Sequence, residues 1–277
     1  MSVNWIDAAT LGVLQGLTEF LPVSSSAHLR IAGEMLPSGA DPGAAFTAIT
    51  QIGTEAAVVV YFWADIMKIA SAWCRQTLRL GPYNVEAARM GWLIMIGSVP
   101  IVVLGLLFKD QIEHDLRNLY ITAITLIGFG LVLGVADRFG QKRLGLTSLS
   151  WRDGLIFGFA QAMALIPGVS RSGGTITAGL IMGYSRDAAA RYSFLLAIPA
   201  VFGSGFYQLF KSIGEDTPVA AGPTALATAL AFVVGYGVIV VFLKLVSTKG
   251  YMPFVAYRAV LGLVVITMLW AGLWQPL

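Results

Sequence analysis

Long apolar stretches separated by short polar segments make up most of the chain. Six of them are long enough to cross a bilayer by themselves: roughly 45–66, 90–108, 118–136, 190–210, 223–243 and 254–274. This follows because about 20 apolar residues span the hydrocarbon core. The pattern therefore predicts an all-α, polytopic membrane protein with six full transmembrane helices.

Two further apolar stretches, residues 4–36 and 152–183, are interrupted in the middle by Pro and Ser clusters. The interruptions read LPVSSSAH and IPGVSRSGG, and each half is too short to cross a bilayer alone. Each stretch is therefore expected to form a re-entrant helix pair that returns to its own side. Irregular backbone at membrane depth is tolerated only where protein buries it or where it lines a wet cavity.

The two interrupted stretches also resemble each other in sequence. At a constant offset of 146 residues, seven positions are identical: Gly12 and Gly158, Gln15 and Gln161, Val23 and Val169, Ser24 and Ser170, Ser26 and Ser172, Ala32 and Ala178, Gly33 and Gly179. We therefore expect one integral-membrane domain, residues 1–277, built from repeat halves 1–148 and 149–277. Each half is a re-entrant pair followed by three spans, and because three is odd the repeat is inverted. In such folds the broken helices meet near the midplane and form the binding site.

Charge and composition set the orientation and exclude some functions. Only 12% of the residues are charged, and the net charge of +3 is too small and dispersed to indicate nucleic-acid binding. The single Cys74 excludes an internal disulfide. Thirteen of the 18 Lys and Arg residues, Arg258 among them, are assigned to loops that face away from the N-terminus. The positive-inside rule places these thirteen in the cytoplasm, so both termini and the first re-entrant pair face outward.

The first interruption gathers an acid, an amide, three hydroxyls and an imidazole: Gln15, Glu19, Ser24, Ser25, Ser26 and His28. Gln15 and Glu19 are four residues apart, so a helix places them on one face. Pro22 ends that helix, and the serines can cap the next one, whose N-terminus attracts anions. Ser25 and His28, three residues apart, are expected to project to the same side.

The second interruption, PGVSRSGGT, places Arg171 between two serines and among glycines. Glycines let backbone N–H groups approach a ligand closely, and arginine grips phosphate in a bidentate way. Each interruption forms the tip of a re-entrant pair, and together the two tips offer an acid, a hydroxyl, an imidazole and a guanidinium. That set fits phosphoryl chemistry, in which positioning and charge neutralisation do most of the catalysis.

Plainer interpretations exist for some of these residues. Serines after a proline are often only helix caps, and a lone membrane histidine can simply bond a backbone carbonyl. Glu19 and Arg171 are harder to explain in this way, because ionisable groups at membrane depth cost several kcal/mol unless paired or hydrated. Glu55 shares a face of the first full span with Gln51. It either lines the same cavity or pairs with a buried polar group.

Four segments of the chain identify a family resemblance: GLTEFLPVSSSAH, QIGTEAAVVVYF, PGVSRSGGT and FLLAIPAVFG. They resemble, in matching order and nearly end to end, the bacterial undecaprenyl-diphosphate phosphatases of the bacitracin-resistance type. The resemblance implies a multi-pass protein of the bacterial plasma (inner) membrane. It also implies a metal-dependent phosphatase that converts undecaprenyl diphosphate to undecaprenyl phosphate and inorganic phosphate. That reaction recycles the lipid carrier of cell-wall synthesis. We expect the metal to be Mg²⁺ or Ca²⁺, because hard cations take oxygen ligands.

The resemblance also implies roles for individual residues. The family's (Glu/Gln)-x-x-x-Glu motif falls on Gln15 and Glu19, and its Pro-Gly-x-Ser-Arg-Ser motif on residues 167–172. The implied catalytic residues are Ser25, His28, Glu19 and Arg171. The expected substrate-binding residues are Ser24, Gly168, Ser170, Ser172 and Thr175 of the family motifs, together with their neighbours Ser26 and Gly173. The expected metal ligands are Glu19 and Gln15 of the family motif, together with Glu55, which lies outside the family pattern.

Three departures from the family pattern bear on these roles. Gln15 takes the amide option, Ala27 replaces a glycine often found before the histidine, and Glu55 stands where an aliphatic residue is common. Glu55 would restore the acid that Gln15 lacks. The expected nucleophile is Ser25 with His28 as general base, while His28 itself and a water stay open as alternatives.

The main rival function is a lipid-phosphate transporter or flippase, because inverted repeats with broken helices are transporter architecture. A carrier would need the arginine and the helix N-termini but not the acid, hydroxyl and imidazole together. A structural scaffold would leave every buried ionisable group unexplained. The expected partners are a lipid diphosphate and the membrane, without nucleic acid, and a homodimer is one option for the oligomeric state.

Overall fold

Six long apolar helices dominate the fold. The structure is a computed structural model that describes residues 3–36, 43–113, 115–212 and 221–276, and within these ranges it contains helices, one isolated bridge and no strand. The helices long and apolar enough to cross a membrane are α3 (Gly43–Tyr61), α5 (Val85–Leu107), α7 (Leu119–Phe139), α10 (Arg186–Ser212), α11 (Ala221–Lys249) and α12 (Met252–Trp270). They confirm the predicted all-α, multi-pass membrane architecture.

Two pairs of shorter helices occupy the interrupted stretches. The first pair is α1 (Trp5–Thr18) and α2 (Ser25–Met35), and the second is α8 (Trp151–Ala162) and α9 (Arg171–Ile181). The longest of these four has 14 residues, about 21 Å at a rise of 1.5 Å per residue, whereas the hydrocarbon core is about 30 Å thick. Both stretches are therefore broken where the Pro and Ser clusters predict, and none of the four helices spans a bilayer alone.

The two breaks have the same local geometry at positions 146 residues apart. Ser24 and Ser170 both have φ of 72°, a left-handed value that is uncommon for a non-glycine residue. Each hydroxyl accepts a hydrogen bond from the backbone N–H three residues on, and so caps the following helix. Each also lies 3.2 Å from the hydroxyl two residues on, Ser26 or Ser172. The sequence similarity between the tips thus reflects a shared cap structure.

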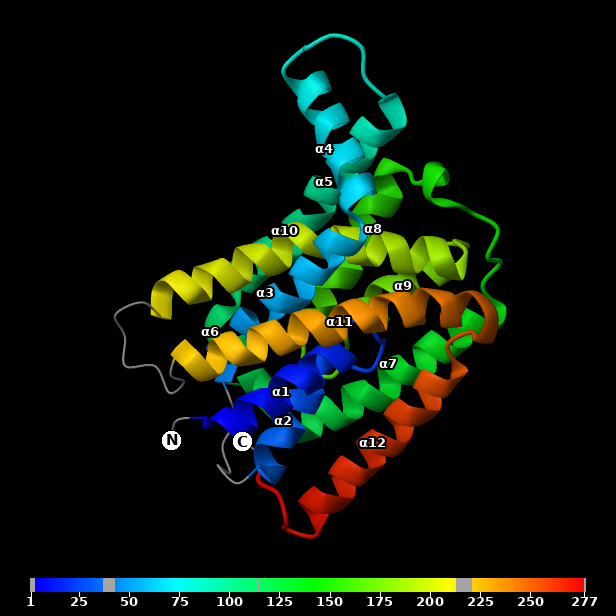
Figure 1. The fold of residues 1–277 in the computed structure, drawn as a ribbon. Coiled ribbons are helices and arrows are strands. Elements are labelled where there is room, and N and C mark those ends of the chain that lie inside the picture. The colour runs from blue at the N-terminus through cyan, green and yellow to red at the C-terminus, as the bar shows by residue number, and fades with distance from the viewer. Residues whose placement is uncertain (1–2, 37–42, 114, 213–220, 277) are drawn as a thin grey trace.

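Helix packing also pairs corresponding elements of the two halves. Helix α1 packs on α11 as α8 packs on α5, while α3 packs on α10 and α7 on α12 (Figure 1). A Cβ atom on Gly12 would lie 2.5 Å from the Ala227 carbonyl oxygen, and one on Gly158 would lie 2.5 Å from that of Gly97. Glycine is required at both positions, because the helix backbones approach too closely for a side chain. These pairings fit an internal repeat, whose inversion and division into halves stay predictions.

One helix lies where a loop was expected. Most of the predicted 67–89 loop is helical, because α4 (Trp63–Thr77) follows α3 after a break at Phe62. Helix α4 and the start of α5 project from the rest of the molecule as a hairpin (Figure 1). The Trp73 and Trp92 rings join them edge to face, with centroids 5.4 Å apart. The sequence did not predict α4, because its polar residues interrupt the apolar runs that were used to identify helices.

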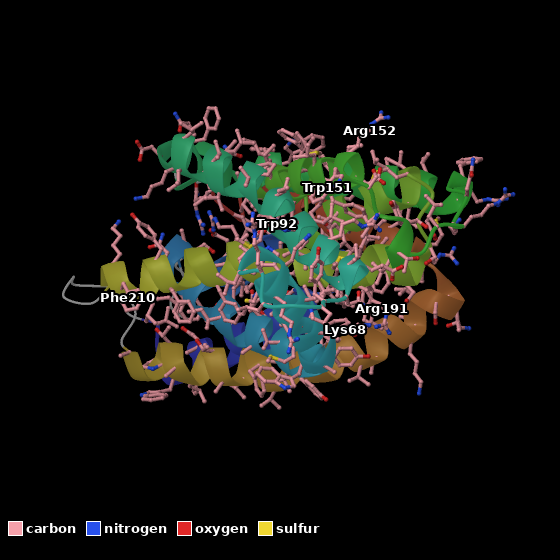
Figure 2. The ribbon with its side chains drawn as sticks, turned by 90° about the horizontal axis from the view of Figure 1, so that it is seen from above. Lys68, Trp92, Trp151, Arg152, Arg191 and Phe210 are labelled. Atoms are coloured by element: carbon pink, nitrogen blue, oxygen red, sulfur yellow. The ribbon has the colours of Figure 1, made fainter. Side chains whose placement is uncertain are left out.

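The assignment of Arg258 to a cytoplasmic loop is wrong. Its side chain is completely buried in the second turn of α12. The other twelve basic residues are assigned to the end of the molecule away from the N-terminus, called the basic end, and that assignment stays a prediction. Figure 2 shows labelled members of this group, Lys68, Arg152 and Arg191, on one side of Phe210, which lies near the opposite end of α10.

Candidate active site

The two broken helix pairs meet at their tips. Arg171, the first residue of α9, donates from Nη2 to Oε1 of Glu19 at 2.7 Å, although 152 residues separate them in sequence. The Ser172 hydroxyl donates to the Leu21 carbonyl oxygen at 3.1 Å. The expectation that the tips come together is therefore confirmed, and the acid of one tip pairs with the guanidinium of the other.

The Glu19 carboxylate is the centre of this contact. It lies at the C-terminal end of α1 and is almost fully buried. Its Oε2 accepts hydrogen bonds from Nε2 of Gln15 at 2.7 Å and from the Ser25 hydroxyl at 2.5 Å. Gln15 and Glu19 thus share a helix face as their spacing predicts, and the amide holds the carboxylate toward the serine.

Ser25 donates a hydrogen bond to the Glu19 carboxylate and lies at the N-terminus of a helix. It is the first residue of α2, where backbone N–H groups lack intrahelical acceptors and favour a bound anion. Its hydroxyl hydrogen points at Glu19 rather than at a neutral acceptor. A serine hydroxyl becomes a nucleophile when an adjacent base takes its proton, and Glu19 is the base in contact here.

His28 does not form the expected pair with Ser25. Its Nδ1 lies 2.7 Å from the Ser24 carbonyl oxygen, and its Nε2 lies 2.7 Å from the Tyr257 hydroxyl on α12. A carbonyl can only accept, so Nδ1 carries the proton and Nε2 of the neutral ring accepts from the tyrosine. The imidazole therefore turns toward α12, and both of its nitrogens already have partners away from Ser25.

Glu55 pairs with Arg171 behind the contact of the two tips. Its Oε2 lies 3.5 Å from Nη2 of Arg171, and its side chain is completely buried in α3. Neither carboxylate oxygen has a hydrogen-bond partner in the described structure. Of the two interpretations left open by the sequence, the pairing with a buried polar group is the one observed. With both acids ionised, Glu19, Glu55 and Arg171 together carry one net negative charge.

The residues predicted to hold a metal supply few protein ligands. In the described parts of the chain, no three His, Cys, Asp or Glu residues gather as a metal site. Both Glu55 oxygens and Oε1 of Gln15 are buried without a hydrogen-bond partner, whereas both Glu19 oxygens already accept hydrogen bonds and would have to share them with a metal. This set fits Mg²⁺, which is usually held by one or two carboxylates together with substrate phosphates.

A cavity of about 520 Å³ opens from the tips. Its polar end is lined by Glu19, Ser24, Ser25, Ser26, Ser170 and Arg171. Its walls come from α3, α5 and α10 and include Ala48, Ile101, Leu106 and Val201. The lining also includes Gln51, Lys109 and Gln208. A mostly apolar cavity with the acid, serines and arginine of the tips in its lining suits an amphipathic ligand with an anionic head.

The remaining predicted binding residues lie outside the cavity lining and hold the second tip. Gly168 has φ of +92°, and a Cβ there would lie 2.1 Å from Oγ1 of Thr125. The Gly173 N–H donates to the Ser170 hydroxyl, and Thr175 contacts the Ser193 hydroxyl at 2.5 Å. The positions of these residues, with that of Ser172, indicate support of the tip rather than direct contact with a ligand.

Comparison with known proteins gives consistent matches over nearly the whole chain. The family model described as bacitracin resistance protein BacA matches residues 8–264. A protein named undecaprenyl-diphosphatase 2 from Agrobacterium fabrum is 75% identical over 272 residues, which cover 98% of each chain. A protein named undecaprenyl-diphosphatase from Arthrobacter sp. (strain FB24) is 62% identical over 97% of this chain and 95% of its own. One of the same name from Micrococcus luteus is 57% identical over 98% of this chain and 99% of its own.

Proposed function

The chain belongs to the bacitracin resistance protein BacA family, and we propose on this premise that it is an undecaprenyl-diphosphate phosphatase. It hydrolyses undecaprenyl diphosphate to undecaprenyl phosphate and inorganic phosphate, and so recycles the lipid carrier of cell-wall synthesis. The observation that carries the proposal is the contact of Ser25 and Arg171 with one carboxylate, Glu19, at the polar end of an apolar cavity.

The transporter alternative is not supported. The relatives that cover nearly the whole chain are named as diphosphatases. A carrier would need the arginine and the helix N-termini, but not the acid and the hydroxyl that meet them here.

Substrate binding starts from the charges and dipoles at the tips. In the described structure, the hydrogen bond and the ion pairs of the Arg171 guanidinium use Nη2. Its other nitrogens are therefore available to the diphosphate, and a bidentate contact would orient it. The α2 N-terminus attracts the terminal phosphate toward Ser25, while the apolar walls accept the start of the prenyl chain.

The chemical step then uses Ser25 and Glu19. The Ser25 Oγ attacks the terminal phosphorus as its proton passes to Oε2 of Glu19, with which it already shares a hydrogen bond. The bond between that phosphorus and the bridging oxygen breaks, and undecaprenyl phosphate leaves. Water then hydrolyses the phosphoserine and releases inorganic phosphate. Glu19 replaces His28 as general base in this proposal, and His28 fixes the first turn of α2 through Ser24 and Tyr257.

A divalent cation, Mg²⁺ or Ca²⁺, is part of the proposal because of the charge balance. With Glu19 and Glu55 both ionised, these two acids and Arg171 carry one net negative charge before a diphosphate, itself an anion, arrives. Glu19 and Glu55, with Oε1 of Gln15, would hold the cation against the diphosphate oxygens. When bound, it would neutralise charge that develops on those oxygens.

Removal of the metal is expected to abolish phosphate release, and added Mg²⁺ to restore it. Glu55→Gln should raise the metal concentration for half-maximal rate by about 10- to 100-fold, because loss of a ligand or its support weakens metal binding by that order. The measurement is a Mg²⁺ titration of phosphate release by purified protein. Glu86→Gln, an exposed acid at the start of α5, serves as the control and should titrate like the wild type. Full activity in excess EDTA would rule out the metal.

The proposed location is the plasma membrane with the cavity open to the outer face. Support comes from Tyr207 and Gln208, which line the cavity near the C-terminal end of α10. Phe210, in the same part of α10, lies in Figure 2 on the opposite side from the labelled basic residues. The positive-inside rule assigns that basic end to the cytoplasm. The homodimer likewise stays a prediction.

Native Cys74, which is exposed on α4, tests this orientation. A membrane-impermeant maleimide should leave Cys74 unmodified in intact spheroplasts and modify it after lysis. In a Cys74→Ser background, a cysteine at the exposed Gln275 should react in both samples. Labelling of Cys74 from outside would reverse the orientation and place the cavity on the cytoplasmic side.

A further inference from the structure

Arg258 is the largest completely buried side chain of the described structure. All of its hydrogen bonds go to backbone carbonyl oxygens, which belong to Pro22, Thr125, Leu126, Gly168 and Val169. None of the ion pairs in the described ranges involves it. This arginine is therefore held by the main chain alone.

Such an arrangement is unusual because a buried charge without a counterion is strongly unfavourable. It persists here because Nε, Nη1 and Nη2 all find acceptors. The acceptors at Pro22, Gly168 and Val169 lie in the irregular backbone of the two tips, where no helix satisfies them. Backbone groups at membrane depth need an internal partner, and Arg258 supplies it for both tips at once.

The contacts lie directly before the proposed catalytic residues. A single nitrogen, Nη1, donates to Pro22 at 3.1 Å and to Val169 at 3.2 Å. Pro22 precedes Ser25 by three residues, and Val169 precedes Arg171 by two. The same guanidinium is anchored on α7 through the Leu126 carbonyl oxygen at 3.0 Å.

We infer that Arg258 is a positioning residue that clamps the two tips together and thereby fixes Ser25 and Arg171 relative to each other. Gly173 fits this role, since a Cβ there would lie 2.8 Å from Nη1 of Arg258. The neighbouring Tyr257 bonds His28 and steadies the start of α2 from the same helix. This inference rests on the proposed function, because the kcat and KM measurements below require phosphatase activity.

The test compares Arg258→Lys with the wild type in nanodiscs. A lysine keeps the charge but cannot reach five carbonyls with a planar fork. We expect kcat to fall by about 10²-fold with little change in KM, because a misplacement on the order of 1 Å has that effect on a reacting group. We also expect faster hydrogen–deuterium exchange in peptides that cover residues 20–27 and 167–174.

The control is Arg186→Lys, which weakens an ion pair with Asp137 at the basic end of the molecule. It should lower Tm while kcat and tip exchange stay at wild-type values. Gly173→Ala provides a second variant that displaces the guanidinium without removing it, and it should change kcat and tip exchange in the same direction as Arg258→Lys.

Wild-type kcat and tip exchange in Arg258→Lys and Gly173→Ala would overturn the clamp. It would also be overturned if both variants lost activity with exchange raised equally throughout the protein, since that is general destabilisation. A wild-type protein that released no phosphate would contradict the proposed function instead, while the exchange measurements would still test the clamp.

Discussion

Ser25→Ala is expected to lower turnover by on the order of 10⁴- to 10⁶-fold, the range found when a catalytic nucleophile is removed. The substitution deletes the hydroxyl that donates to Glu19 but leaves the α2 N-terminus and Arg171 in place. Substrate should therefore still bind. The measurement is phosphate release from a C15 or C55 diphosphate by purified protein.

Ser26→Ala is the matched control for this prediction. Ser26 also lines the cavity, but its hydroxyl contacts Ser24 rather than Glu19. Its loss should change turnover by less than about tenfold, since one neutral hydrogen bond contributes about 1 kcal/mol. Near-normal turnover in Ser25→Ala would eliminate the serine as nucleophile.

The chemical nature of the intermediate gives a second readout of the same claim. Brief reaction with substrate labelled with ³²P on the terminal phosphate should leave label on the protein that survives acid, as phosphoserine does. Label lost in acid would indicate phosphohistidine. That result would contradict an imidazole whose two nitrogens bond Ser24 and Tyr257. Absence of label at every quench time would favour direct attack by water.

Arg171→Ala is expected to lower kcat by about 10²- to 10³-fold, as loss of one preorganised donor does. Arg171→Lys should restore only part of the rate, since a point charge cannot make the bidentate contact. The alanine variant should also be less stable, because it leaves the Glu19 and Glu55 carboxylates without their shared cation. Phosphate release and Tm measured on the same preparations check both effects.

The half-buried arginine Arg191, which pairs with Asp187 near the start of α10, is a suitable control. Arg191→Ala should leave kcat and Tm nearly unchanged, because surface ion pairs contribute about 1 kcal/mol or less. Wild-type turnover in Arg171→Ala would remove the guanidinium from the mechanism, whatever its effect on stability.

The sequence predicted the parts of the fold that depend on local composition. Apolar length identified the six spans, and the Pro and Ser clusters identified the two breaks between short helices. The four-residue spacing of Gln15 and Glu19 placed both on one face, where they now bond each other. Helix α4 was not predicted, because its polar residues interrupt the apolar pattern.

Contacts between distant segments could not be predicted in the same way. The partner of His28 lies 229 residues away on α12, so the expected pairing with Ser25 rested on helix spacing alone. Arg258 did carry a signal, because it falls within the predicted span 254–274, where ionisable residues face the protein interior. Its position near the end of that span led to its assignment to a loop.

We propose that this protein breaks the phosphoanhydride bond of a lipid diphosphate where its two tips meet. The most direct test incubates the purified protein in nanodiscs with undecaprenyl diphosphate and Mg²⁺, and measures both products. We predict one inorganic phosphate and one undecaprenyl phosphate for each lipid consumed, with neither formed by Ser25→Ala. The proposed phosphatase would be contradicted if undecaprenyl diphosphate stayed intact after prolonged incubation with the wild-type protein. Equal product formation by Ser25→Ala would contradict the serine mechanism.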